Sequence, residues 1–199
     1  IVQNMKMATD ADNNFVASGF YADDMFSGVR GVFFMTLDRN TSQVIKTKKQ
    51  PFTATFLSSG QAAWEQSWRD RNRQGNSRPQ ALADFRVLEF RPTHDGGFVV
   101  ITENQSVVLV PRTSGTPDNP RVSYTENFFF DDLIVYKLNE TGDLQWVRRI
   151  PKNQQSTNDN GKFLSVAHGV TNDKVYLLFN DVRRNYDASG RFIDGQFPF

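Results

Sequence analysis

The sequence predicts an all-β protein built from antiparallel four-stranded meander repeats, and three observations support this fold class. Phe is unusually common, with 18 copies among 199 residues, and aromatic side chains favour half-buried strands. A pattern of strand, polar turn and apolar strand occurs three times, at 7–21, 90–104 and 167–181. A second predicted hairpin follows the first two copies, at 31–49 and 131–152. Repeats of this size are typical of β-propellers and other arrays.

The turns of these hairpins consist of residues that tolerate positive φ. The first turn of each copy is rich in Asp, Asn and Gly, which suits tight hairpins. These turns are Asp12–Asn14, Asp95–Gly97 and Asn172–Lys174, and the second turns are Asp38–Asn40 and Asn139–Asp143. We expect Gly97 to need a positive φ, so that Gly97→Val would damage folding.

The units follow each other along one domain. We predict blade 1 at about 1–56, blade 2 at about 81–152, and a partial blade 3 at about 160–199 that ends after its second strand. About 2.5 blades form a partial β-propeller. Because the ring is incomplete and the chain opens at Ile1, we expect a longer natural protein. In 133–138, apolar residues occupy both alternating sets, which predicts a strand buried on both faces.

Two insertions interrupt the repeats. The first, at about 57–80, contains the one predicted helix, Gln61 to Arg73, with Ser58 or Ser59 as its cap. The second, Pro111–Asn127, is rich in Pro, Ser, Thr and Asn and is predicted to be an extended loop. The helix could bind a ligand or partner, or it could simply dock on its own domain. Its candidate binding residues are Trp64, Trp68, Arg69, Arg71 and Arg73.

Composition excludes several classes of function. A net charge of +1 does not suggest nucleic acid or an anionic membrane as a partner. The chain contains no Cys, which rules out disulfides, thiolate metal sites and a catalytic cysteine. No apolar run reaches the roughly 18 residues of a transmembrane helix. Nucleotide-binding motifs are absent, and we expect no cofactor.

Groups of polar residues offer weaker hypotheses of chemistry, and each has a simpler structural interpretation. His94 and His168 could share a metal, or could be surface residues of turns. Asp10–Asn14 and Asn158–Gly161 faintly resemble calcium loops, although Asx-rich turns are common without calcium. The doublets Asp23-Asp24 and Asp131-Asp132 could serve glycoside chemistry, but adjacent strand residues point to opposite faces. We interpret the doublets as charges that protect sheet edges.

The second unit resembles a repeat of secreted or cell-surface bacterial β-propeller-like proteins, particularly those of the Bacteroidetes. The matching motif residues are Thr93, Asp95-Gly96-Gly97-Phe98, Asp132, Lys137-Leu138, Gly142, Leu144 and Trp146. The resemblance covers about 85–185 and is looser over 7–50, where Asn-Asn replaces Gly-Gly. It implies a propeller-like fold and an extracytoplasmic setting, and it supplies no activity. We expect structural roles for Asp95, Gly96, Gly97, Gly142 and Trp146, with Trp146 buried between neighbouring sheets.

These observations lead to one functional hypothesis and two alternatives. The first is a non-enzymatic extracytoplasmic scaffold whose inserted loops bind a protein or glycan at the bacterial surface. One alternative is a carbohydrate-active hydrolase or lyase on a propeller scaffold. The other is a subunit of a larger cell-surface complex.

Overall fold

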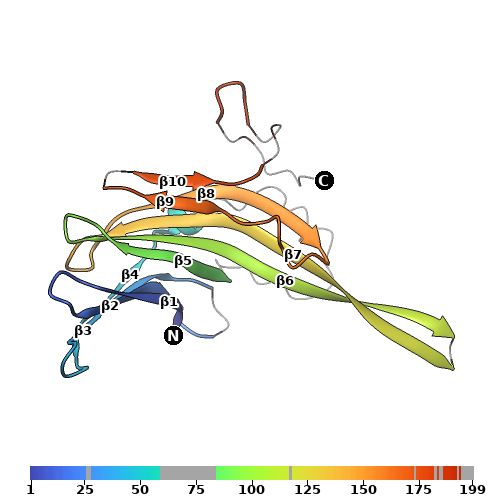
Figure 1. Cartoon of the computed structure of the whole chain (residues 1–199), viewed down its shortest axis with the longest axis horizontal. Coiled ribbons are helices and arrows are strands. Elements are labelled where there is room, and N and C mark those ends of the chain that lie inside the picture. Colours follow the sequence, from blue (N-terminus) through green and yellow to red (C-terminus); the bar gives the residue numbers. More distant parts are fainter. Residues whose placement is uncertain are drawn as a thin grey trace.

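The structure of the chain is a computed structural model, which describes residues 1–25, 28–58, 84–116, 118–172, 174–181, 183, 186–191 and 193. It confirms the all-β class: every ladder is antiparallel, and each sheet keeps its strands in chain order. The described residues form two four-stranded sheets and one two-stranded hairpin, so the predicted meander repeat is present (Figure 1).

The three units are named sheet A, sheet B and hairpin C. Sheet A consists of β1 (Val2–Thr9), β2 (Phe15–Tyr21), β3 (Gly31–Leu37) and β4 (Val44–Pro51). A short helix, α1 (Ala54–Ser58), follows it. Sheet B consists of β5 (Phe85–Pro92), β6 (Phe98–Thr116), β7 (Asn119–Leu138) and β8 (Leu144–Thr157). Hairpin C consists of β9 (Ala167–Val170) and β10 (Val175–Leu178).

The units stack face to face in chain order, with sheet B in the middle (Figure 1). The core between sheets A and B is rich in rings, among them Phe20 against Phe85 at a centroid distance of 5.7 Å. On its other face, sheet B packs Val99, Ile101 and Val135 against hairpin C. The strand buried on both faces is confirmed, because residues 133–136 of β7 are all buried. The described part of the chain is an open stack and does not close into a ring.

In the turn between the first two strands of each unit, the structure differs from the prediction in one detail. The residue with positive φ is Gly96 at +75°, and Asn13 takes the same place in the first unit at +63°. Gly97 is required for another reason: a Cβ there would lie 2.4 Å from the carbonyl oxygen of Leu138. Substitution of Gly97 is therefore still disfavoured, but the cause is close backbone approach and not the sign of φ.

The turn between the third and fourth strands of sheet B has a counterpart near the C-terminus. Asn139 Oδ1 accepts hydrogen bonds from the amide and hydroxyl of Thr141 and from the amide of Asp143. Asp187 Oδ1 accepts the same three bonds, from the amide and hydroxyl of Ser189 and the amide of Arg191. The glycines at the fourth position, Gly142 and Gly190, have φ of +81° and +79°.

The third unit has one feature that we did not expect within its predicted bounds of 160–199. Its two described strands match the prediction, but a turn of the type that joins strands three and four follows them at Asp187–Arg191.

One prediction about the insertions is wrong, and the other lies outside the described residues. Pro111–Asn127 is not a loop, because β6 and β7 continue through it as a paired ribbon up to Thr116 and Asn119. The described helix after sheet A begins at Ala54, where Thr53 Oγ1 accepts the amide of Phe56, and Ser58 is its last described residue. The predicted helix from 61 to 73, with all five candidate binding residues, lies outside the described residues.

Candidate functional site

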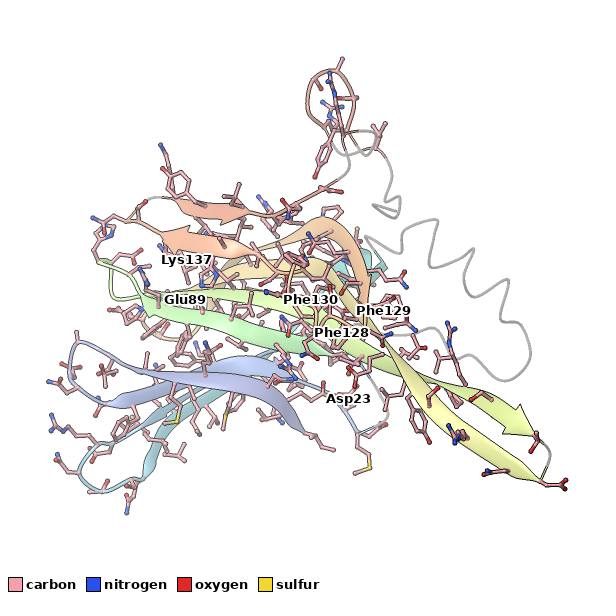
Figure 2. All side chains as sticks on the ribbon, turned by 45° about the vertical axis from the view of Figure 1, so that its right-hand side comes forward. Asp23, Glu89, Phe128, Phe129, Phe130 and Lys137 are labelled. Carbon is pink, nitrogen blue, oxygen red and sulfur yellow. The ribbon has the colours of Figure 1, made fainter. Side chains whose placement is uncertain are left out.

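The outer part of the β6–β7 ribbon extends beyond the body of the molecule and holds more exposed large apolar side chains than any other element that the structure describes (Figure 1). We call this part the arm and define it as Val107–Thr116 of β6 with Asn119–Tyr124 of β7. Figure 2 labels Phe128, Phe129 and Phe130 at the root of the arm. The exposed fractions of its large apolar side chains range from 41% to 62%.

The register sorts the side chains of the arm onto two different faces. Directly opposite residues of an antiparallel pair share a face, and neighbours along a strand alternate. One face is mostly apolar, and its pairs are Leu109 with Glu126, Pro111 with Tyr124, and Thr113 with Val122, preceded by Val107. The other face begins with Val108 and Val110 and is polar beyond them, with Arg112, Ser114, Arg121 and Ser123.

The apolar face of the arm continues a face that the chain itself covers closer to the body. Val107 is opposite Phe128, which is 8% exposed. A Cβ at Gly161 would lie 3.2 Å from the ring of Phe130 and 3.6 Å from Phe128, so the loop containing Gly161 lies over these rings. The apolar surface therefore passes from a covered part at the root to an uncovered part on the arm.

Both edges of the arm lack partners in the described structure. Toward the tip of the arm, the outermost hydrogen bond between β6 and a residue outside the ribbon joins the Gln105 amide to the Asp84 carbonyl, at 3.0 Å. On β7 the corresponding bond is from the Asn158 amide to the Glu126 carbonyl, at 2.9 Å. Pro111 and Pro120 stand on these edges, and proline discourages the addition of further strands. The arm is thus better suited to contact through its face than through its edges.

A sequence signal for the arm exists but is weak. Residues 107–110 and 122–124 contain β-branched and aromatic residues, which favour strands. Pro, Gly, Asn and Ser between them indicate a loop by composition, and this outweighed the strand signal.

The acid doublets do not protect sheet edges, so that interpretation is wrong. Asp131 and Asp132 lie in the interior strand β7, at a register shift between Asp131 and Leu133. Asp132 accepts a bond of 2.6 Å from Arg149 Nε and one of 3.1 Å from the Lys152 amide. Burial raises the pKa of Asp132 even though Arg149 lies beside it. Asp23 is in the loop after β2, is 71% exposed and lies 3.9 Å from Arg30.

A buried ion pair lies near Asp131 and Asp132. It was not predicted from the sequence. Lys152 Nζ is 2.9 Å from Glu103 Oε1, and both side chains are fully buried. The ammonium also donates to the carbonyl oxygen of Phe130 at 2.8 Å, and Gln105 donates to Glu103 Oε2. Burial lowers the pKa of Lys152, and the nearby carboxylates act in the opposite direction. Among the described residues, Glu103 Oε1 has the ion pair with Lys152 but no hydrogen bond, so the contacts of this group are mainly electrostatic.

The residues that we considered as possible metal ligands lie in turns and surface contacts. Asp10 Oδ1 accepts the amides of Asp12 and Asn14, and Asp159 Oδ1 accepts the Gly161 amide. His168 Nε2 lies 3.4 Å from Glu89, while His94 is exposed in the β5–β6 turn. Within the described ranges, no group of three or more acidic or histidine side chains could hold a metal ion.

The motif residues connect strands and sheets. Asp95 accepts 2.5 Å bonds from Lys137 Nζ and Thr93 Oγ1, and the lysine bond holds the pKa of Asp95 well below its usual range. Trp146 is half-buried against the core that sheet B shares with hairpin C. Trp146 thus lies against the core where we expected it, but it is less buried than predicted.

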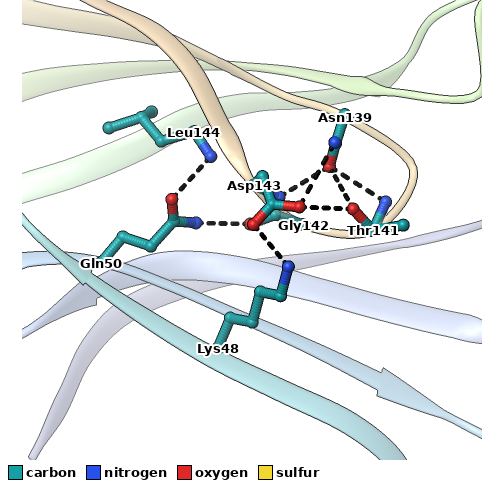
Figure 3. A network of polar contacts seen from close by, with 7 residues as sticks. All are labelled: Lys48, Gln50, Asn139, Thr141, Gly142, Asp143 and Leu144. Carbon is teal, nitrogen blue, oxygen red and sulfur yellow. Dashed lines mark hydrogen bonds and ion pairs between the residues drawn. The ribbon is translucent and has the colours of Figure 1, made fainter.

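The turn that contains Gly142 connects sheet B to sheet A, as Figure 3 shows. Gln50 Nε2 on β4 donates to the Gly142 carbonyl at 2.6 Å, and Gln50 Oε1 accepts the Leu144 amide at 2.8 Å. Lys48 lies 2.5 Å from Asp143 and, with Thr141, lowers the pKa of Asp143 to about 2.

Comparison with known proteins gives no relative from which function could be transferred. No family model, no curated protein and no solved structure matches the chain. Among the described residues, no helix has the length and apolar character needed to span a membrane.

Proposed function

We propose that this chain is a non-enzymatic β-repeat scaffold that binds a partner protein through the apolar face of its arm. The observation that carries the proposal is the placement of Val107, Leu109, Pro111, Val122 and Tyr124 on one face of a ribbon that leaves the body. Contiguous exposed apolar surface on a soluble protein marks an interaction site.

The energetics favour a partner that covers this face. A half-exposed Val or Leu gains about 1 kcal/mol when the rest of its surface is buried. Four of the five residues named above are half-exposed in this way, with exposed fractions of 53% to 62%. At the root of the arm, the same surface is already covered by polypeptide, at Phe128 and Phe130 under Gly161. A protein surface continues this covering outward.

The chemistry of the face supports a protein better than a glycan or a lipid surface. Sugars stack on aromatic rings, and Tyr124 is the single aromatic side chain among the apolar residues of the arm. Glu126 lies on the same face, opposite Leu109, and a carboxylate there opposes entry into a lipid interface.

Two further parts of the proposal concern architecture and setting. The sheets are successive blades of a propeller-like array, which the stacking of all three units in chain order supports. The extracytoplasmic setting is supported by the resemblance of the second unit to secreted repeat proteins. The full-length reading frame tests both, through the number of further units and the presence of an export signal.

Site-specific photo-crosslinking in the cells that produce the protein tests the binding role of the arm. A photoreactive residue replaces Val122 or Tyr124 on the apolar face, and Arg121 or Ser123 on the opposite face as a matched control. We expect one protein to be captured from 122 and 124 and not from 121 and 123. Equal capture from both faces, or none, would overturn the proposal.

A further inference from the structure

The outer face of sheet A, which points away from sheet B, is a second exposed apolar surface. Val16 and Phe20 of β2 belong to the core with sheet B, so the alternating residues Phe15 and Ala17 lie on the outer face. The register adds Met7 opposite Ala17, and Ala17 opposite Met35. Met7 and Phe15 are 53% and 44% exposed, whereas Ala17 beside them and Phe33 farther along the face are buried, at 1% and 6%.

Sheet B has residues at the positions that correspond to Met7, Phe15 and Ala17, and in sheet B these residues are buried. Phe15 and Phe98 both open the second strand of a unit, opposite Thr9 and Pro92. When the two units are aligned on Phe15 and Phe98, Met7 corresponds to Phe90, and Ala17 corresponds to Val100. Phe90 and Phe98 are only 7% and 1% exposed, because this face of sheet B packs against sheet A.

Hairpin C follows the same rule. Val175 opens its second strand opposite Val170, and Val175 and Leu177 face sheet B. In each of these two junctions, the first residue of the second strand faces the unit that precedes it in the chain. The face of sheet A with Phe15 is of this kind, and none of the described units packs against it.

The opposite kind of face is left uncovered at the other end of the stack. Tyr176 and Leu178 alternate with the buried set of β10 and are 56% and 76% exposed. Their counterparts in sheet B, Val99 and Ile101, are 4% and 0% exposed under hairpin C. In the part of the chain that the structure describes, two faces of complementary kind are therefore left without a packing unit.

We infer that the outer face of sheet A binds the Tyr176–Leu178 face of hairpin C from a second copy of this chain. The contact repeats the packing that joins sheet A to sheet B and sheet B to hairpin C. It is a head-to-tail contact between different faces, so it generates open chains or a closed ring of copies. Met5, Met7 and Met35 lie on the receiving face, and their flexible side chains adapt to a partner.

The contact is weak, because hairpin C offers only two strands to a four-stranded sheet. Sedimentation velocity over a wide range of protein concentration is therefore the suitable measurement. We expect the average mass of the wild-type chain to rise with concentration. A wild-type chain that stays monomeric over the whole range would overturn the inference.

Two exposed substitutions test which faces meet. Met7→Lys blocks the receiving face, and Leu178→Lys blocks the inserting face. Each variant alone should be monomeric, whereas a mixture of the two should form a one-to-one dimer and nothing larger. If Leu178→Lys alone dimerises, two sheet A faces pair with each other and the inference is wrong. If Met7→Lys fails to fold by circular dichroism, Met5→Lys, at 51% exposure on the same face, replaces it.

Matched controls separate this contact from the proposed role of the arm. Phe163→Lys changes an apolar side chain that is 71% exposed outside both faces, and association should be unchanged. Tyr124→Ser on the arm should also leave association unchanged. Loss of association in the Tyr124→Ser variant would assign it to the arm and overturn the inference, whereas the crosslinking result for the arm would stand.

Discussion

The hydroxyl of Tyr136 lies 3.0 Å from Ser18 Oγ at the centre of the interface between the two sheets, where neither residue has any exposed surface. Ser18 donates to the carbonyl oxygen of Phe33 at 2.9 Å, so Tyr136 is the donor to Ser18. Burial raises the pKa of Tyr136, which keeps this phenol protonated.

Tyr136→Phe removes the hydrogen bond between the sheets and keeps the ring. We expect a loss of about 1 kcal/mol in the free energy of unfolding, since neutral buried hydrogen bonds contribute about that much. Urea denaturation measures the change. Tyr176→Phe, at a 56% exposed position, is the control and should have no effect.

Gly142→Ala should be far more damaging than Gly190→Ala, although both glycines have positive φ in the same type of turn. A Cβ at Gly142 would lie 2.2 Å from the ring of Phe34, whereas none of the described atoms lies within 4 Å of a Cβ at Gly190. We expect about 1 kcal/mol of backbone strain at Gly190 and about 2–4 kcal/mol in total at Gly142. Thermal melts of both variants test this, and equal losses would contradict the clash with Phe34.

The ion pair between Lys48 and Asp143 should make the contact between the sheets sensitive to acid. The folded-state pKa of Asp143, about 2, is below the ordinary value of 3.8, so its contribution to stability is present above pH 3.8. It is lost as pH falls through about 2. We expect wild type to be more stable than Asp143→Asn near pH 6, and the difference to disappear near pH 2.

Urea denaturation at a series of pH values measures the Asp143 effect. Glu140→Gln changes an exposed acid of the same turn and serves as the control. A difference between wild type and Asp143→Asn that stays constant with pH would show that the charge of Asp143 is not responsible.

Removal of one partner of the buried ion pair should cost more than removal of both. Lys152→Met leaves the Glu103 carboxylate buried without its cation, and we expect a loss of about 3–5 kcal/mol. The double variant Lys152→Met with Glu103→Met should recover most of this loss. Arg91→Met, which breaks the exposed pair with Glu89, should cost about 0–1 kcal/mol.

The repeat could be predicted from the sequence because its signals are local. The turn residues from Asp95 to Gly97 and from Asn139 to Asp143 lie between apolar strands, and each turn joins neighbours in the chain. Burial of β7 on both faces followed from its unbroken apolar run at 133–136. The first unit has Asn13 at the position that Gly96 occupies in the second unit. The turn is the same, because Asn tolerates positive φ.

The arm could not be predicted by the same means. Pro111 normally argues against a strand, but on an unpaired edge its missing N–H costs no ladder hydrogen bond. The pair of Glu103 and Lys152 joins β6 to β8 across β7, and no local pattern indicates such a contact. The two exposed faces of the stack likewise became visible only from the register of all three units.

The stack is unequal at its two junctions. Among the described residues, fourteen buried residues form the core between sheets A and B, whereas three buried residues of sheet B pack against hairpin C. Gln154 adds a tether, because its amide donates to the Asn180 carbonyl and its oxygen accepts the Ser165 amide. Unfolding should therefore begin at the C-terminal hairpin, and the backbone amides of β10 should exchange with deuterium long before those of β2 and β7.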